Sequence, residues 1–271
     1  MNPRTRQIIY SLAVLTWSAV LLYFHASGRI TKYLATDFRP VALAGGLGLA
    51  VLGLFNLLTA GQEAACGHDH GGEQDPHHPD RSYWSSLTAF LLMVLPVAAA
   101  VAWTTDSYSI AALARKGLYD APAGIASPLL ALSMGALTPE NIEKGSRKTA
   151  DGFHQLDLIE LYFATGDREL QTLIDGLKVE TKGRLIDEKT GNPHGTRKRL
   201  YRLFITCCAA DSRVIPIILE FGSPPPEFPD NAWVRVAGTL RFQLEGGVLQ
   251  AVLTAERVLA TEPPSEESFM R

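Results

Sequence analysis

Three long apolar runs lie within the first 105 residues of the chain. They cover about 8–24, 41–60 and 87–103, and none of them contains Asp, Glu, Lys or Arg. A helix needs roughly 17–25 apolar residues to cross a hydrocarbon core of about 30 Å. The runs therefore predict three transmembrane helices in a membrane domain over 1–105. Three buried helices of a soluble protein are the alternative.

Residues at the ends of the runs also fit a membrane. Aromatic side chains of the kind found at membrane–water interfaces stand at the ends of the first and third runs: Tyr10, Tyr23, Phe24, Tyr83, Trp84 and Trp103. Small residues in the second run would let this helix pack closely on a neighbour: Gly45, Gly46, Gly48 and Gly53. We therefore expect a multi-pass membrane protein, in contact with the lipid bilayer.

The basic residues beside the runs give a weak orientation signal. Five fall on one side of three spans (Arg29, Lys32, Arg39, Arg115 and Lys116) and three on the other (Arg4, Arg6 and Arg81). Because loops rich in Lys and Arg stay in the cytoplasm, this small difference favours a cytoplasmic C-terminal domain.

The loop 61–82 between the second and third runs is rich in histidine. It holds four of the seven histidines of the chain together with one cysteine: Cys66, His68, His70, His77 and His78. Imidazole, thiol and carboxylate groups suit zinc and similar cations, although the glycines and prolines here favour a flexible loop. The composition predicts weak, adaptable metal binding, and a solvated loop without a role is the alternative.

The second half of the chain has the pattern of a soluble α+β domain. Residues 106–150 read as a connector of short helices and turns. Within 151–262, apolar spacing predicts two helices between Phe153 and Leu177, with Asp167 at the start of the second. A period of two then predicts five strands: Leu177–Ile186, Arg199–Cys207, Val214–Phe221, Ala232–Phe242 and Leu249–Leu259.

Five short strands between about 177 and 260 favour a small closed sheet, and an OB-like barrel is the simplest candidate. The predicted fold class is membrane α + β, with three transmembrane helices followed by a small, mostly-β, OB-like barrel domain with flanking helices. The tail 263–271, rich in Glu, Ser and Pro, is predicted to be disordered.

Two neighbouring cysteines, Cys207 and Cys208, end the second strand and are followed by Asp211. Two thiols and a carboxylate suggest a site for zinc or another divalent cation, to which His154 or Cys66 could add a fourth ligand. A redox or metal-relay thiol pair is a second possibility, and two small buried residues are the structural alternative. No CxxC motif and no nucleophile–base spacing accompany them, so no catalytic residue is predicted.

A basic cluster over His194–Arg199 raises the question of nucleic acid, which OB barrels often bind. However, the net charge of the chain is −3 and no run of strand aromatics accompanies the cluster. A solvated hairpin tip is the preferred interpretation, and no nucleic-acid partner is expected.

Several of these motifs together resemble one known family. They are His25–Gly28, Tyr33, Pro96, Lys116–Gly117, Thr206–Asp211 and Trp233–Gly238. The chain resembles the bacterial YcgQ-like permease subunits, with the double cysteine as the most specific part. This resemblance implies a multi-pass protein of the bacterial inner membrane with a small C-terminal β domain, a multi-span permease as partner and an accessory role in transport. It also supports the metal prediction for 66–80, while Arg213 departs from the proline that many members carry near this position.

The leading prediction is a non-enzymatic accessory subunit of a membrane permease that handles or senses a metal cation. A membrane-tethered metal sensor or store acting alone is the alternative, and a thiol-based redox protein is the third. Membrane spans without ionisable residues are poorly suited to form a transport path by themselves, which is why the first is favoured.

Overall fold

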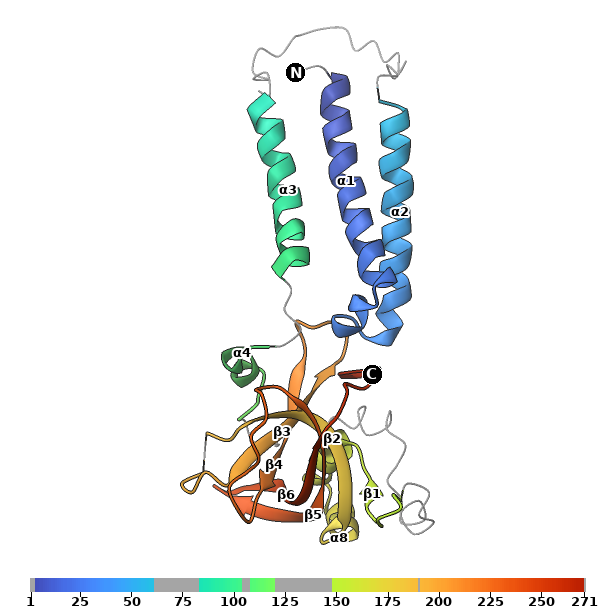
Figure 1. Ribbon diagram of the computed structural model, residues 1–271. Helices are drawn as coiled ribbons and strands as arrows, with labels where there is room; N and C mark the ends of the chain where they lie inside the picture. The colour runs from blue at the N-terminus through green and yellow to red at the C-terminus, as the bar shows by residue number, and fades with distance from the viewer. Residues whose placement is uncertain (1–2, 61–82, 104–107, 120–147, 190, 271) are drawn as a thin grey trace. The chain divides into compact units, whose positions relative to one another are not determined.

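The computed structural model describes residues 3–60, 83–103, 108–119, 148–189 and 191–270. The chain forms two compact units, Met1–Asp106 and Ser107–Arg271. The first unit contains three long helices, shown in Figure 1: α1 (Pro3–Ala26), α2 (Arg39–Leu58) and α3 (Tyr83–Trp103). Two short 3-10 turns, η1 (Arg29–Lys32) and η2 (Thr36–Phe38), lie between α1 and α2.

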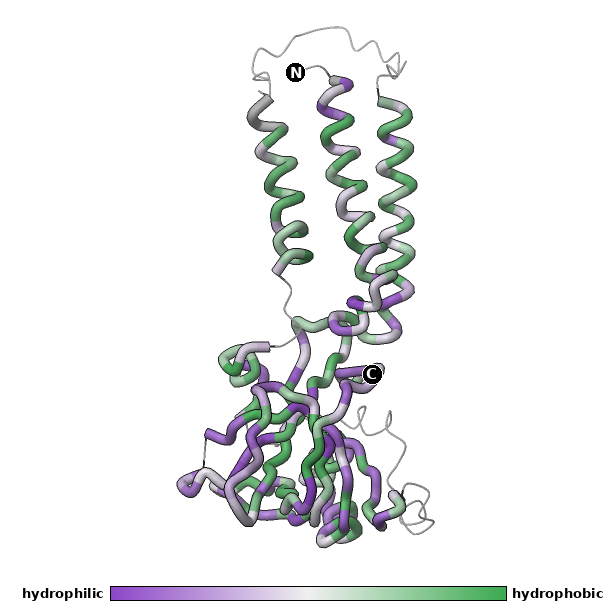
Figure 2. The backbone as a smooth tube through the Cα atoms, viewed as in Figure 1, coloured by the Kyte–Doolittle hydropathy of each residue, from purple (hydrophilic) through white to green (hydrophobic). Residues whose placement is uncertain are grey.

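Two helical stretches in this unit, Arg4–Ala26 and Thr36–Leu58, are long and apolar enough to cross a membrane. In α3, the apolar stretch with described side chains is the shorter Leu87–Trp103. Figure 2 shows hydrophobic residues along all three helices. Two of the three predicted spans therefore meet the length criterion in the described residues.

Glycine brings α1 and α2 into close contact. Gly46 and Gly53 are buried on α2, and a Cβ atom added to Gly53 would lie 2.7 Å from the Leu15 side chain of α1. The Ser18 hydroxyl donates a hydrogen bond of 2.7 Å to the Gly46 carbonyl. This is the small-residue packing expected of helices in a bilayer, where polar groups bond across the interface.

The second unit is built around five strands that close into a barrel: β2 (Lys178–Asp187), β3 (Arg197–Ile205), β4 (Arg213–Glu220), β5 (Trp233–Glu245) and β6 (Val248–Ala260). Their order is β2-β5-β6-β4-β3, and β3 pairs again with β2. The β4–β6 pair is parallel and the other pairs of the ring are antiparallel. This closed five-stranded arrangement is consistent with the predicted OB-like barrel.

Two short helices precede the barrel, α7 (Leu158–Ala164) and α8 (Arg168–Ile174). The α7 helix packs against β2, β3, β4 and β6, and its Leu158 and Leu161 side chains are fully buried in the barrel core. Asp167 caps α8, because its carboxylate accepts the Glu169 and Leu170 amides at 2.9 and 3.1 Å. The predicted helix pair and its capping residue are confirmed.

The described part of the connector, 108–119, forms a short helix, α4 (Ile110–Arg115), and docks on the barrel. Its Leu113 and Leu118 side chains are fully buried and cluster with residues of β2, β3 and β4: Ile186, Tyr201 and Val214. Residues 120–147 of the connector lie outside the described residues. The segment 108–119 therefore belongs to the barrel unit.

The prediction of a disordered tail over 263–271 is wrong for the residues that the structure describes. Phe269–Met270 form a short strand, β7, that pairs in parallel with β3. The Arg202 guanidinium donates to the Glu266 and Glu267 carbonyls at 2.6 and 3.2 Å. Composition missed these contacts because they come from a strand more than sixty positions earlier in the chain.

Candidate metal centre

The two cysteines lie in the loop that joins β3 to β4. The strand ends at Ile205, two residues before the predicted end at Cys207, and β4 begins at Arg213. Neighbouring residues of a strand point to opposite faces, whereas residues of a loop are free of that restriction. The earlier end of β3 is therefore what allows both thiols to approach the same point.

Asp211 organises this loop from its inner side. Its two carboxylate oxygens accept the backbone amides of Cys207 at 2.9 Å and of Cys208 at 3.3 Å. The Asp211 amide in turn donates to the Cys208 carbonyl at 3.1 Å. Short acidic side chains commonly stabilise turns in this way, by bonding to the nearby backbone.

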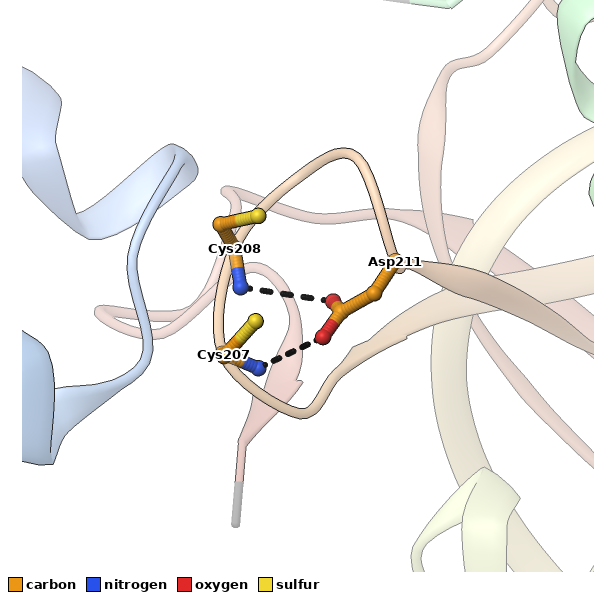
Figure 3. A group of neighbouring side chains, drawn as sticks. All are labelled: Cys207, Cys208 and Asp211. Carbon is orange, nitrogen blue, oxygen red and sulfur yellow. Dashed lines mark hydrogen bonds between the residues drawn. The ribbon is translucent and has the colours of Figure 1, made fainter.

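The turn brings three possible metal ligands together. One ligand atom from each of Cys207, Cys208 and Asp211 lies within 4.8 Å of the other two. Figure 3 shows both sulfur atoms on the side of the loop that faces the Asp211 carboxylate. Both cysteines are partly exposed and Asp211 is exposed. Neither thiol is therefore buried in the barrel core, the alternative that composition favoured.

The pKa values of Cys207, Cys208 and Asp211 are shifted in different directions. A hydrogen bond to the Asp211 carboxylate, followed by one to Cys208, raises the pKa of the Cys207 thiol to about 11. The backbone amides of Ala210 and Asp211 lower the pKa of Cys208. Burial raises the pKa of Asp211, but hydrogen bonds from the Cys207 thiol and the loop amides outweigh it, and the net shift is downward.

Two thiols and one carboxylate form a donor set for a borderline cation such as zinc. Two thiolates about 2.3 Å from a tetrahedral zinc ion lie roughly 3.8 Å apart. The ligand atoms of this loop lie within 4.8 Å of one another, which is compatible with that spacing. A carboxylate oxygen offers more lone pairs than the loop amides use, which leaves Asp211 able to bind a cation. Three protein ligands would leave one position for water or a fourth residue.

Of the two suggested fourth ligands, His154 is among the described residues and is not part of this group. His154 lies on a short strand, β1 (His154–Gln155), which pairs with β2. Burial, and next the charge of Lys148, lower the pKa of this imidazole. Cys66 lies outside the described residues, as do the other predicted ligands of its loop: His68, His70, His77 and His78.

Lys116 contacts the same loop, although the sequence analysis did not place it in the candidate metal centre. Its ammonium group donates to the carbonyls of Ala209 at 3.0 Å, Ala210 at 3.4 Å and Ser212 at 3.4 Å. The residue follows α4 and is more than ninety positions away from the loop. Periodicity and composition carry no signal for a contact of this kind.

The basic cluster of the β2–β3 hairpin is bonded to carboxylates within the barrel. Arg197 contacts Glu220 at 2.9 Å and Glu245 at 2.7 Å, and Lys198 contacts Asp187 at 2.8 Å. Arg199 pairs with Glu188, and both side chains are almost completely buried. The basic side chains of Arg197, Lys198 and Arg199 therefore have carboxylate partners within the barrel unit.

The structure thus defines a protein with apolar N-terminal helices and a small C-terminal barrel that carries a dithiol–carboxylate loop. Two family models match the chain, the DUF1980 N-terminal domain over residues 9–118 and the DUF1980 C-terminal domain over 170–266. The chain therefore contains both domains of the DUF1980 family. Neither description mentions a permease or a double cysteine, so the permease assignment stays a prediction.

No curated protein matches this chain. Among solved structures, a DUF3299 family protein from Pseudomonas aeruginosa is similar over 33% of this chain, with 11% sequence identity and a TM-score of 0.24. The match spans 64% of the length of that protein. A likeness this small carries no functional argument.

Proposed function

We propose that this protein is an accessory subunit of a membrane permease, and that its barrel domain binds a thiophilic divalent cation through Cys207, Cys208 and Asp211. The observation that carries the cation site is the approach of the three ligand atoms to within 4.8 Å of one another. The cation would be zinc or one of similar ligand preference, because thiolate ligands select such ions.

The loop is suited to a cation that binds reversibly. Its backbone is already held by Asp211, so the ligands need little reorganisation before binding. The raised pKa of Cys207, about 11, means that this thiol keeps its proton at neutral pH until a cation displaces it. The same property disfavours catalysis by Cys207, since the thiolate is the nucleophilic form. We therefore propose a binding role for Cys207, whereas the lowered pKa of Cys208 is the property on which the third possibility, a thiol-based redox protein, rests.

The membrane part of the proposal includes α3 as a third span. Its apolar stretch in the sequence, 87–103, carries no charged residue, and neither do 8–24 and 41–60. Transport paths for ions usually contain ionisable or polar groups within the membrane. Three such helices therefore suit an anchor beside a separate, multi-span permease. The histidine-rich loop 66–80 would add weak cation binding.

Metal analysis of the full chain in mild detergent tests the cation site. Wild-type protein dialysed against zinc should retain about one tightly bound equivalent per chain. The Cys207→Ser/Cys208→Ser variant should lose it, whereas the matched control Cys66→Ser and a deletion of 66–80 should retain it. Equal zinc content in the wild type and the double variant would refute the proposed site.

The permease role is tested separately by purification from native membranes. A multi-span permease should co-purify with the wild-type chain at a fixed ratio. A chain that binds zinc but is recovered alone would favour the alternative of a membrane-tethered metal sensor or store. Reversible oxidation of the two thiols in a chain without zinc would favour the third possibility, a thiol-based redox protein.

A further inference from the structure

The segment 108–119 reaches the cysteine loop by a specific turn. The α4 helix is followed by Gly117, whose φ of 93° is the left-handed conformation that glycine adopts readily. The Leu118 amide bonds back to the Leu113 carbonyl at 3.1 Å and the Gly117 amide to the Ala114 carbonyl at 3.2 Å. These bonds are typical of a glycine-terminated helix end. The turn buries Leu113 and Leu118 together.

This turn places both the backbone and the side chain of Lys116 against the loop. The Lys116 carbonyl accepts the Val214 amide at 2.9 Å, at the start of β4. The three hydrogen bonds from its ammonium group to the carbonyls of Ala209, Ala210 and Ser212 match the three donors that a lysine has. Hydrogen bonds that involve a charged donor are stronger than neutral ones.

The cysteine loop is therefore held from two sides. Inside the turn, the Asp211 carboxylate accepts hydrogen bonds from the amides of Cys207 and Cys208. From outside the loop, the Lys116 ammonium group donates hydrogen bonds to the carbonyls of the next two residues, Ala209 and Ala210. A loop of this length has no ladder of strand hydrogen bonds to fix its shape. The Ser212 hydroxyl also donates to the Ala209 carbonyl, at 2.7 Å. The shape of the loop, and with it the spacing of the two thiols, depends on the side chains of Asp211, Lys116 and Ser212 together.

We infer that Lys116 is a positioning residue, which holds the loop 206–212 in the form that brings Cys207, Cys208 and Asp211 together. The expected effect of Lys116 on cation affinity rests on the proposed function. Its expected effect on the shape of the loop is independent of that function.

Lys116 also has an effect that lowers the affinity for a cation, in contrast to its positioning role. A positive charge near a cation site disfavours the cation, so removal of the ammonium group would by itself raise the affinity. The three carbonyls that surround the ammonium group offset part of its charge. Partners that orient metal ligands are typically worth about 10-fold to 100-fold in metal affinity. We therefore expect the loss of positioning to outweigh the loss of repulsion.

The test compares the full-length wild type with Lys116→Met, which keeps the apolar stem of the side chain and removes the three donors. Lys182→Met is the matched control, because Lys182 is an exposed lysine on β2 in the same domain. Amide hydrogen exchange of metal-free protein in detergent reports the shape of the loop. Competition for zinc ion with a chromophoric chelator reports the affinity. Protection of the β5–β6 amides shows that the barrel is folded.

The expected result is faster exchange of the Cys207, Cys208 and Val214 amides in Lys116→Met, with β5–β6 protected as in the wild type. Zinc affinity should fall by roughly 10-fold to 100-fold, and Lys182→Met should behave as the wild type. Unchanged loop exchange, or an unchanged or increased zinc affinity in Lys116→Met, would overturn the inference. Faster loop exchange in a protein whose wild type binds no zinc would support the positioning role and refute the proposed cation site.

Discussion

The buried ion pair between Glu188 and Arg199 gives a quantitative prediction for the stability of the barrel unit. The side chains are only 1% and 5% exposed, respectively. The Arg199 guanidinium also donates to the Leu118 carbonyl and lies over the Tyr119 ring at 5.0 Å. One charged pair therefore joins β3 to the docked segment 108–119, in surroundings with little water.

Glu188→Ala should destabilise the unit by about 3–5 kcal/mol, because it leaves the Arg199 charge buried without its partner. That is a large part of the roughly 5–15 kcal/mol that stabilises a typical domain. Replacing both residues, as Glu188→Leu/Arg199→Met, removes the buried charges together. The remaining cost is then the unpaired Leu118 carbonyl, about 1–3 kcal/mol. The double variant should consequently be more stable than Glu188→Ala.

Urea titration of the full chain in detergent, followed by the exchange of β2 and β3 amides, measures these differences. Asp187→Ala is a matched control, since the Asp187–Lys198 pair lies one position away and Asp187 is 69% exposed. Its loss should cost about 1 kcal/mol or less. A double variant as unstable as Glu188→Ala, or a Glu188→Ala cost no larger than that of the control, would refute the reasoning.

Two further predictions concern β5 and β3. Gly238 lies at a bulge where a Cβ atom would be 2.0 Å from the Thr254 carbonyl oxygen. Gly238→Ala should therefore lower the free energy of unfolding by about 3 kcal/mol or more in the same urea titration. A decrease below about 1 kcal/mol would contradict this. Burial raises the pKa of Tyr201 from 10.0 to about 12. The unfolded chain therefore loses this proton first, and stability should fall by up to about 1.4 kcal/mol per pH unit between those two values. The stability of Tyr201→Phe should depend less on pH in that range. A decline identical to that of the wild type would contradict the assignment of this pH dependence to Tyr201.

The strands were predictable because each one is rich in apolar and β-branched residues and is bounded by turn signals. This holds even for β4, which is buried on both faces. All five predicted strands agree with β2–β6 to within a few residues. The turn between β5 and β6 contains Gly246 and Gly247, which both have positive φ, and a Gly-Gly pair between two strand patterns is a hairpin signal. In contrast, the end of β3 was placed at Cys207 instead of Ile205. Apolar content continues through the cysteines, so the pattern alone could not show that the chain leaves the sheet earlier.

The cysteine loop and the tail were decided by contacts between distant parts of the chain. Asp211 was identified from its proximity in sequence to the cysteines. Lys116 was recognised only as part of a family motif, and its contact with the cysteine loop was not predicted. The tail has the composition of a disordered segment, yet Arg202 holds its backbone and lies 3.8 Å from the Phe269 ring centre. Composition measures the average burial that a segment can achieve alone, and it does not include a partner supplied by another strand.

The sequence by itself determined the apolar helices, the five strands and the adjacent thiols, because hydrophobic periodicity and residue chemistry are local properties. Only the tertiary structure decided that both thiols leave the sheet and face one carboxylate, and that a lysine from the connector holds their loop. The physical reason is that the shape of a short loop depends on hydrogen bonds to whichever groups the fold brings beside it. Here one of those groups, the Asp211 carboxylate, lies within the loop itself, and the other, the Lys116 ammonium group, lies more than ninety positions away in the chain.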